Sequence, residues 1–332
     1  MVYDSVSFKT AKLNLPRELA FAAGRLLSRQ FPGSWRVANA RAKARQMLHH
    51  FVERTIPSKP VVCTTNHDFK LIVQPGIDRG VERAIYTRGS YEAGTLWAFS
   101  QLLRPGDVFV DVGANIGLMS IHAARLVGDS GAVFSFEPMP DIFAQLQANI
   151  GLNAARHVRA FNIALGSELG ELPIFAHPEI NRGSSSLLTA GTPANHIVAV
   201  STLDSFAASH IKRSIRMIKV DVEGWELEVL RGGVDTLSGD AAPILCIECS
   251  ELHGLSGGTL QDMFSEITSS NQYKCFMLEK GKEFPSPFVP ITRVEQLPKH
   301  DNLFCFPPTI PFPQTLEPSQ SPRVHPERQG RA

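Results

Sequence analysis

The sequence lacks any apolar stretch long enough to cross a membrane, and its first residues lack the apolar core of a secretory signal. It also lacks a marked excess of either charge. The chain has 33 Lys and Arg residues against 32 Asp and Glu residues, a formal net charge of +1. Bulk charge therefore favours neither a nucleic acid nor a membrane surface as partner. We expect a cytoplasmic protein with no membrane span.

Cysteine is scarce, with five residues scattered over a chain of 332. An odd, dispersed set is a poor disulfide framework and favours a reducing compartment. Cys246 and Cys249 form a C-x-x-C, but they lie in "PILCIECSE", which is typical of a buried strand. Zinc and redox sites place this spacing in turns, so we expect no metal at this motif.

The composition divides the chain into three parts. Residues 1–60 hold eleven Lys or Arg and only three Asp or Glu residues, and apolar residues recur there at helical spacing. We predict a basic helical N-terminal extension, either solvated or in contact with an acidic partner. Residues 61–306 form the main domain. Residues 307–332 contain seven prolines, which predicts a Pro-rich disordered tail.

The main domain alternates short β-branched runs with helical patterns, which predicts an α/β fold with helices on both faces of a mostly parallel sheet. The last two predicted strands follow each other without a helix, so we expect an antiparallel strand at that edge. The predicted strands are 108–113, 132–137, 158–165, 217–222, 244–249, 274–278 and 302–306. The predicted helices are 117–127, 141–152, 203–211, 225–237 and 259–270.

A glycine-containing turn follows the first of these strands, in "VFVDVGANIGLMS". The order D-x-G-x-N-x-G places Asn115 where a dinucleotide turn needs its middle glycine. A phosphate loop needs a lysine directly after its last glycine, and Gly117 is followed by leucine. The turn is therefore not built for pyrophosphate. This weakens, without removing, the alternative of a nicotinamide-dependent oxidoreductase.

Two acidic residues indicate what the turn accepts instead. Asp111, directly ahead of the turn, would repel phosphates and suits a ligand with a positive centre, such as S-adenosylmethionine (SAM). Glu137 ends the next strand, at the spacing of an acid that binds both ribose hydroxyls. Each acid alone has an ordinary structural explanation, as a turn cap or a solvated side chain. In this order and at this spacing they predict a SAM site.

Longer stretches make the sequence resemble the FkbM family of SAM-dependent methyltransferases. The matching segments include "SYEAGTLWAFSQLLRPGDVFVDVGANIGL", "VFSFEPMPDIFAQLQANIGLN" and "MIKVDVEGWELEVLRGG". The resemblance implies a class I methyltransferase, with a seven-stranded, mostly parallel sheet whose last strand is antiparallel. It further implies O-methylation of a hydroxyl on a small-molecule, sugar, glycan or natural-product acceptor. It leaves the identity of the acceptor open.

The resemblance also assigns roles to individual residues. Glu137 would hold the ribose of SAM, Asn162 would lie near the adenine, and Asp221 would face the methyl-transfer centre. The methionine end of SAM would be lined by four residues of the turn, Asp111, Gly113, Asn115 and Gly117.

The stretch "KVDVEGWE" offers a general base for deprotonating an alcohol. Glu223 is our first choice and Asp221 the alternative, because one of two neighbouring carboxylates can have a raised pKa. Glu248 is a third acid expected at the same sheet edge, so the group could instead hold Mg²⁺. Glu223 could also have a purely structural role. A non-catalytic SAM-binding module and, more weakly, an RNA methyltransferase remain as alternatives.

Overall fold

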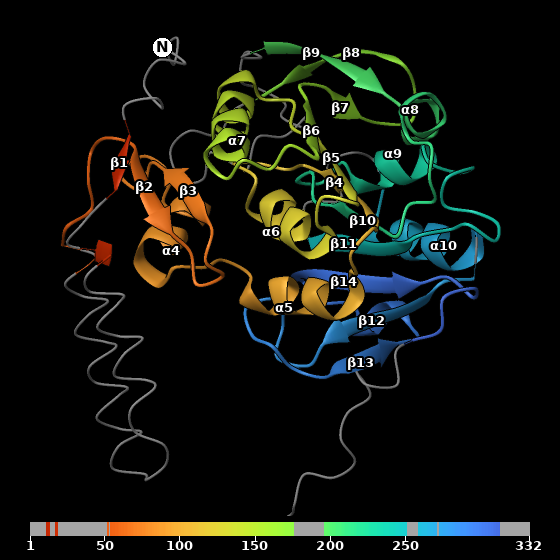
Figure 1. Ribbon diagram of the computed structural model, residues 1–332. Coiled ribbons are helices and arrows are strands. Elements are labelled where there is room, and N and C mark those ends of the chain that lie inside the picture. The colour runs from red at the N-terminus through yellow and green to blue at the C-terminus, as the bar shows by residue number, and fades with distance from the viewer. Residues whose placement is uncertain are drawn as a thin grey trace, which may run out of the picture.

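The computed structural model describes residues 11–13, 17–18, 52, 54–175, 196–250, 258–270 and 272–312. Most of the predicted N-terminal extension and the tail beyond residue 312 lie outside the described residues. The described part is an α/β structure, with one eight-stranded sheet and two three-stranded sheets beside it (Figure 1). Within it, no helix is both long and apolar enough to cross a membrane.

The eight-stranded sheet is mixed, with a parallel half and an antiparallel half. Its order is β13-β12-β14-β11-β10-β4-β5-β6. Neighbours from β11 to β6 are parallel, whereas β14 runs antiparallel to both β11 and β12. The strands are β4 (Val108–Val112), β5 (Ala132–Phe136), β6 (Val158–Phe161), β10 (Met217–Val220), β11 (Ile244–Ser250), β12 (Lys274–Leu278), β13 (Phe288–Ile291) and β14 (His300–Phe306).

The sheet has eight strands, one more than the seven expected. The additional strand, β13, pairs antiparallel with β12 at the sheet edge. It is only four residues long and contains Pro290, and proline in a strand is tolerated mainly at such an edge. The strand predicted over 158–165 also ends early: β6 stops at Phe161, and Ala164–Leu165 (β7) belongs to a separate sheet.

Helices cover both faces of the large sheet because its strands alternate their side chains between two apolar cores. On β4, Phe109 joins the core beneath one set of helices, whereas Val108 and Val110 join the core beneath the other. The first set is α5 (Ala93–Leu102), α6 (Leu118–Val127) and α7 (Pro140–Leu152). The second is α8 (Leu203–His210), α9 (Glu226–Arg231) and α10 (Leu260–Ser270).

Two small sheets flank this layered body. One contains β1 (Lys12–Leu13), β2 (Val61–Thr64) and β3 (Lys70–Val73), followed by α4 (Val81–Arg88), and lies beside α7 (Figure 1). The other pairs β7 and β8 (Gly170–Ile174) with β9 (His196–Ser201).

The chain after β14 continues onto the outer part of the large sheet. Phe312 stacks on Phe276 of β12, with ring centroids 4.3 Å apart, and packs edge-on against Phe306. The first residues of the predicted tail, 307–312, are therefore part of the described fold. All five cysteines are free and buried, and the C-x-x-C pair lies within strand β11.

Candidate active site

A cleft opens where the parallel strands β4, β5 and β10 end. The space between its walls and at its open mouth is about 1220 Å³. The turn after β4, the loop after β5 and the loop after β10 all contribute to its wall. This is the edge at which open α/β sheets bind ligands. Predicted site residues in the wall are Gly113, Asn115, Glu137, Asp221, Glu223 and Glu248.

Gly113 allows two loops to meet at the floor of the cleft. Its φ of +82° lies in the left-handed region, and its amide donates to the Phe136 carbonyl oxygen at 3.0 Å. A Cβ at this position would collide with the backbone carbonyl of Asp221. Glycine is thus required both by the backbone conformation and by the close approach of the loop after β10.

Glu137 organises the turn from the neighbouring strand. Its two carboxylate oxygens accept the backbone N–H groups of Asn115 and Met139, each at 2.9 Å. Burial raises the pKa of Glu137 to about 7, although these two hydrogen bonds oppose the rise. A carboxylate oxygen can accept more than one hydrogen bond, so Glu137 can hold the turn and still receive hydroxyl donors from the cleft.

Three residues predicted to contact SAM do not line the cleft. Asp111 is completely buried, accepts a hydrogen bond from Ser120 at 2.5 Å, and has an Oδ1 without a partner among the described residues. Gly117 lies at the start of α6, where a Cβ would meet Leu146 of α7. Asn162 is exposed and donates to the carbonyls of Glu137 and Pro138. Asp111 and Gly117 are packed inside the fold at the turn, and Asn162 holds the loop after β5.

The position of the Asp111 side chain follows from its neighbours in the sheet. It lies on the same face of β4 as Phe109, beside Lys219 of β10 in the sheet register. Burial raises the pKa of the Asp111 carboxyl, against the opposing effects of Lys219 and Ser120. Its side chain thus lies beneath the turn, where sequence position alone suggested a ligand contact.

Another part of the cleft wall is built from charged side chains. Asp221 follows β10 and bonds to Lys219 Nζ at 2.6 Å. Burial raises the pKa of Asp221, but Lys219 and Lys282 more than offset it, so this pKa lies below its usual value. Burial, with Asp221 nearby, holds the pKa of Glu248 well above the ordinary range. The two carboxyls therefore differ in their readiness to lose a proton.

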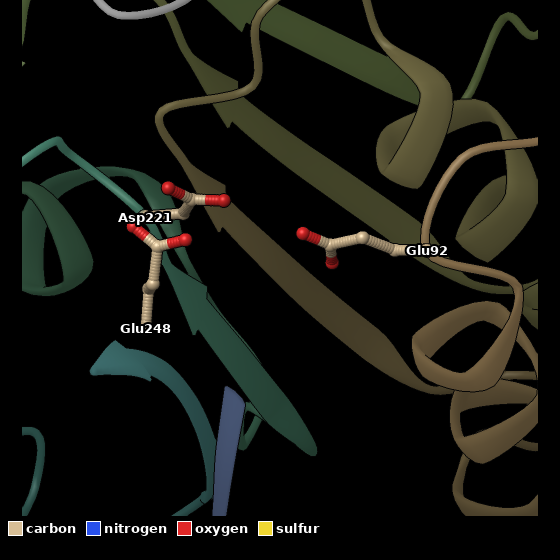
Figure 2. Close-up of side chains that lie close together, drawn as sticks. All are labelled: Glu92, Asp221 and Glu248. Carbon is tan, nitrogen blue, oxygen red and sulfur yellow. The ribbon is translucent and has the colours of Figure 1, made fainter. Parts of the chain in front are cut away.

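Lys282 joins Glu248 to a third acid, Glu92. Sequence reasoning did not identify this lysine as part of the site. Its Nζ lies 2.7 Å from Glu248 Oε1 and 3.1 Å from Glu92 Oε1, with His300 Nε2 at 3.2 Å. Figure 2 shows Glu92 reaching from the side of α5 towards Asp221 and Glu248, which come from the central strands. The lysine itself comes from the loop between β12 and β13, a part of the chain with no recognisable motif.

Backbone contacts hold the Lys282 loop against α5. The Lys282 carbonyl accepts the N–H groups of Gly94 and Thr95, and its own N–H donates to Asp301 Oδ1 at 2.9 Å. A Cβ at Gly94 would lie 2.8 Å from the Lys282 carbonyl oxygen. The glycine in "YEAGTLW" therefore lets this loop close on the helix, and Lys282 is only 6 % exposed.

Glu223 lies in the cleft wall on a left-handed turn, with φ of +55°. Glu226 holds the turn, because its carboxylate accepts the N–H groups of Val222 at 2.9 Å and Gly224 at 3.0 Å. Burial raises the pKa of Glu223 to about 8, with Asp221 and Glu226 adding to the rise. Such a carboxyl exchanges its proton close to neutral pH, which suits acid–base chemistry.

Three carboxylates of this group could in principle hold a metal ion. One oxygen each of Glu92, Asp221 and Glu248 lie within 4.8 Å of one another. However, Lys282 already bridges Glu92 and Glu248, and Lys219 pairs with Asp221. Two ammonium groups thus supply positive charge where a cation would otherwise be needed.

Strand order and the position of the cleft together define a class I methyltransferase-like fold, with a parallel half and a last strand, β14, that runs antiparallel between β11 and β12. Residues 111–275, about half of the chain, match the family described as the methyltransferase FkbM domain. The predicted resemblance is therefore confirmed.

Named relatives agree with the family. A hexuronic acid methyltransferase, AglP of Haloferax volcanii, is 34% identical over 133 residues, covering 40% of this chain and 52% of the relative. Methyltransferase 1 of Beauveria bassiana is 32% identical, covering 39% and 59%. The 31-O-demethyl-FK506 methyltransferase FkbM of Streptomyces tacrolimicus is 31% identical, covering 40% and 62%. The chain thus spans only about half to three fifths of the length of these relatives.

Solved structures show a weaker likeness. A SAM-dependent O-methyltransferase from Thermotoga maritima aligns with 12% identity over 75% of this chain and 92% of its own, at a TM-score of 0.38. A methyltransferase from Streptococcus mutans in complex with SAH gives a TM-score of 0.36 and 9% identity, covering 64% and 94%. These scores are too low to assign the fold on their own, and the assignment depends on strand order and the family match.

Proposed function

We propose that this protein transfers the methyl group of SAM to a hydroxyl oxygen of a sugar, glycan or natural-product acceptor. One observation carries the proposal: the D-x-G-x-N-x-G turn, the Glu137 carboxylate and the Glu223 carboxyl all border one cleft. The first two suit a nucleoside ligand without phosphate, and the third suits removal of a proton from an alcohol. The family match supports methyl transfer and leaves the acceptor atom to this argument.

The residues of the cleft wall support a SAM site. Glu137 can accept the two ribose hydroxyls, and the apolar side chains of Phe136, Ile163 and Leu165 line the wall nearby for a flat base. Lys219 is the one lysine among the described lining residues, and it is bonded to Asp221. The wall therefore presents no obvious cation for a phosphate, which weakens the nicotinamide alternative.

When bound, SAM would supply a methyl group on a positively charged sulfur. The chain's own task is then to exclude water, orient the acceptor hydroxyl and take its proton. Glu223 is the proposed proton acceptor, because its pKa of about 8 makes it a stronger base than Asp221. Asp221, held ionised by lysine, would stabilise positive charge in the cleft and remains the alternative base.

The names of two relatives guide the choice of acceptors to test. One relative is named for a hexuronic acid and another for demethyl-FK506, so both sugars and macrocyclic natural products belong in a first screen. Glu92 and Tyr91 also line the cleft, in the charged part of the wall where the acceptor hydroxyl would have to lie. A cytoplasmic location and an acidic partner for the N-terminal extension stay predictions from the sequence.

Calorimetric titration with SAM tests the proposal before any acceptor is known. Wild-type protein should bind SAM and not NAD, and Glu137→Gln should bind SAM about 10- to 100-fold more weakly, because hydrogen bonds to a charged group contribute about 1.5–3 kcal/mol. Wild-type affinity should also rise as pH increases through about 7, since the ionised Glu137 is the better acceptor. The variant should lose that pH dependence.

Glu171→Gln, on an exposed residue of β8, is the matched control and should leave affinity unchanged. NAD binding without SAM binding would restore the oxidoreductase alternative. SAM binding without methyl transfer, followed as SAH release across sugar and macrolide acceptors, would favour a non-catalytic module.

A further inference from the structure

Helix α7 presents a row of amide side chains to the free edge of strand β3. Gln145, Asn149 and Asn153 are four residues apart and therefore lie on one face of the helix region. Asn153 Oδ1 accepts the Lys70 N–H and its Nδ2 donates to the Lys70 carbonyl. Asn149 Oδ1 accepts the Ile72 N–H at 2.7 Å. The helix thus takes the place of a neighbouring strand.

The two repeats fit each other in length. Four residues of helix rise about 6.0 Å, and two residues of strand rise about 6.6 Å. Successive amides on α7 can therefore meet alternate residues of β3, the ones whose backbone groups point away from β2. Gln145 completes the row, because its Nε2 donates to the Ile72 carbonyl at 2.9 Å and to Glu82 Oε2 at 2.6 Å.

Asn149 is the member of the row that also reaches the cofactor turn. Its Nδ2 donates to the Ile116 carbonyl at 2.8 Å, and Ile116 lies between Asn115 and Gly117 in the turn. The side chain is completely buried, so water cannot replace either bond. Leu146, three residues before Asn149 on α7, lies against Gly117.

We propose that Asn149 is a positioning residue for SAM: it fixes the turn from Asn115 to Gly117 by holding the Ile116 carbonyl while strand β3 holds Asn149. The inference rests on the proposed function, because it requires the turn to bind SAM. It adds a structural link between the cofactor site and the small N-terminal sheet. Binding at the turn and order at the β3 edge should therefore change together.

Asn149→Ala and Asn153→Ala provide the test, with SAM affinity measured by calorimetry well below the melting temperature. Both variants lose hydrogen bonds to β3, but only the first loses the bond to the turn. We expect Asn149→Ala to weaken SAM binding about tenfold, and Asn153→Ala to leave it within about twofold. Asn149→Asp keeps the size and the acceptor for Ile72 N–H while removing the donor, and should resemble Asn149→Ala in affinity.

Hydrogen exchange on the wild-type protein gives a second readout that needs no variant to fold. Saturating SAM should slow exchange of the Ile72 amide, which bonds to Asn149, and leave the Lys70 amide, which bonds to Asn153, unchanged. Wild-type affinity in a folded Asn149 variant, or no protection at Ile72, would overturn the inference while leaving the proposed function intact. A wild-type protein that binds no SAM would overturn both.

Discussion

Two parts of the cleft wall are built in different ways. At the turn after β4, shape comes from backbone: glycine at Gly113, a left-handed Asn115 with φ of +50°, and the Asn115 amide donating to Glu137. In the part around Asp221, side chains dominate, with Lys219 and Lys282 placed among carboxylates. The first part suits recognition of a fixed cofactor. The second places adjustable charges where proton transfer is proposed.

This difference predicts two kinds of sensitivity. The turn after β4 should tolerate no added atoms, because the interior is close-packed and moving the main chain costs free energy. In the charged part of the wall, substitutions of equal size should leave the fold intact but change the acid–base behaviour. Substitutions in each part can therefore test the contrast.

Gly113→Ala should have the largest effect on SAM binding. The new Cβ would collide with the Asp221 carbonyl, and alanine would have to adopt φ of +82°. Strain and overpacking together should cost about 3 kcal/mol, so SAM binding should weaken about a hundredfold or more, with a lower melting temperature. Gly239→Ala is the control: its φ is +74° but nothing lies within 4 Å of the added atom. An equal drop in melting temperature in both variants would mean that the left-handed φ alone, and not the collision with Asp221, causes the effect.

Glu223→Gln should leave SAM affinity within about twofold and lower kcat about 10²- to 10⁴-fold, the usual contribution of a general base. With an acceptor in hand, the wild-type rate should rise with pH and level off above about 8, because only the ionised Glu223 accepts a proton. The variant should lose this limb of the profile. Asp221→Asn separates the two candidate bases: an activity loss there, with Glu223→Gln still active, would transfer the role to Asp221.

Lys282→Met should destabilise the fold by about 3–5 kcal/mol, because Glu92 and Glu248 would be buried without their ammonium partner. The loss, measured by denaturant unfolding, should shrink as pH falls, since protonated carboxyls need no counter-charge. Lys280→Met, on an exposed residue of the same loop, is the control. Adding Glu248→Gln to Lys282→Met should restore part of the stability. No restoration would mean that packing of the lysine stem matters more than its charge.

The turn after β4 was predictable from the sequence, whereas much of the charged part of the cleft wall was not. Gly113, Asn115 and Glu137 lie within one strand–turn–helix–strand unit, and the strands of a parallel sheet bring their carboxyl ends together. Order along the chain was therefore enough to predict these residues in one wall. Lys282 lies in a loop far along the chain, and only the closure of that loop on Gly94 brings it to the acids. No local pattern carries this information.

Elements of the fold divide similarly. The long apolar strands and most helices of the main domain were predictable from their periodicity. Short or edge elements, such as β13 with Pro290, carry too few residues for a periodic signal. The place of Asp111 before the turn is clear from the sequence, but its burial is not. Both faces of β4 are covered by apolar cores, so strand alternation does not show that Ser120 encloses this carboxylate beneath the turn.

Asn162→Ala should have the smallest effect. It tests whether Asn162 only supports the loop after β5 or contacts the adenine of SAM. In the structure its Nδ2 donates to the Glu137 and Pro138 carbonyls at 2.9 and 2.8 Å from an exposed position. Losing these bonds should loosen the loop after β5 and weaken SAM binding about three- to fivefold, with little change in melting temperature. Asn66→Ala, an exposed asparagine that donates to the Arg88 carbonyl, should leave affinity unchanged. A loss well beyond tenfold would instead place Asn162 in contact with the adenine, as the family resemblance implied, and would extend the cofactor site beyond the wall formed by Gly113, Asn115 and Glu137.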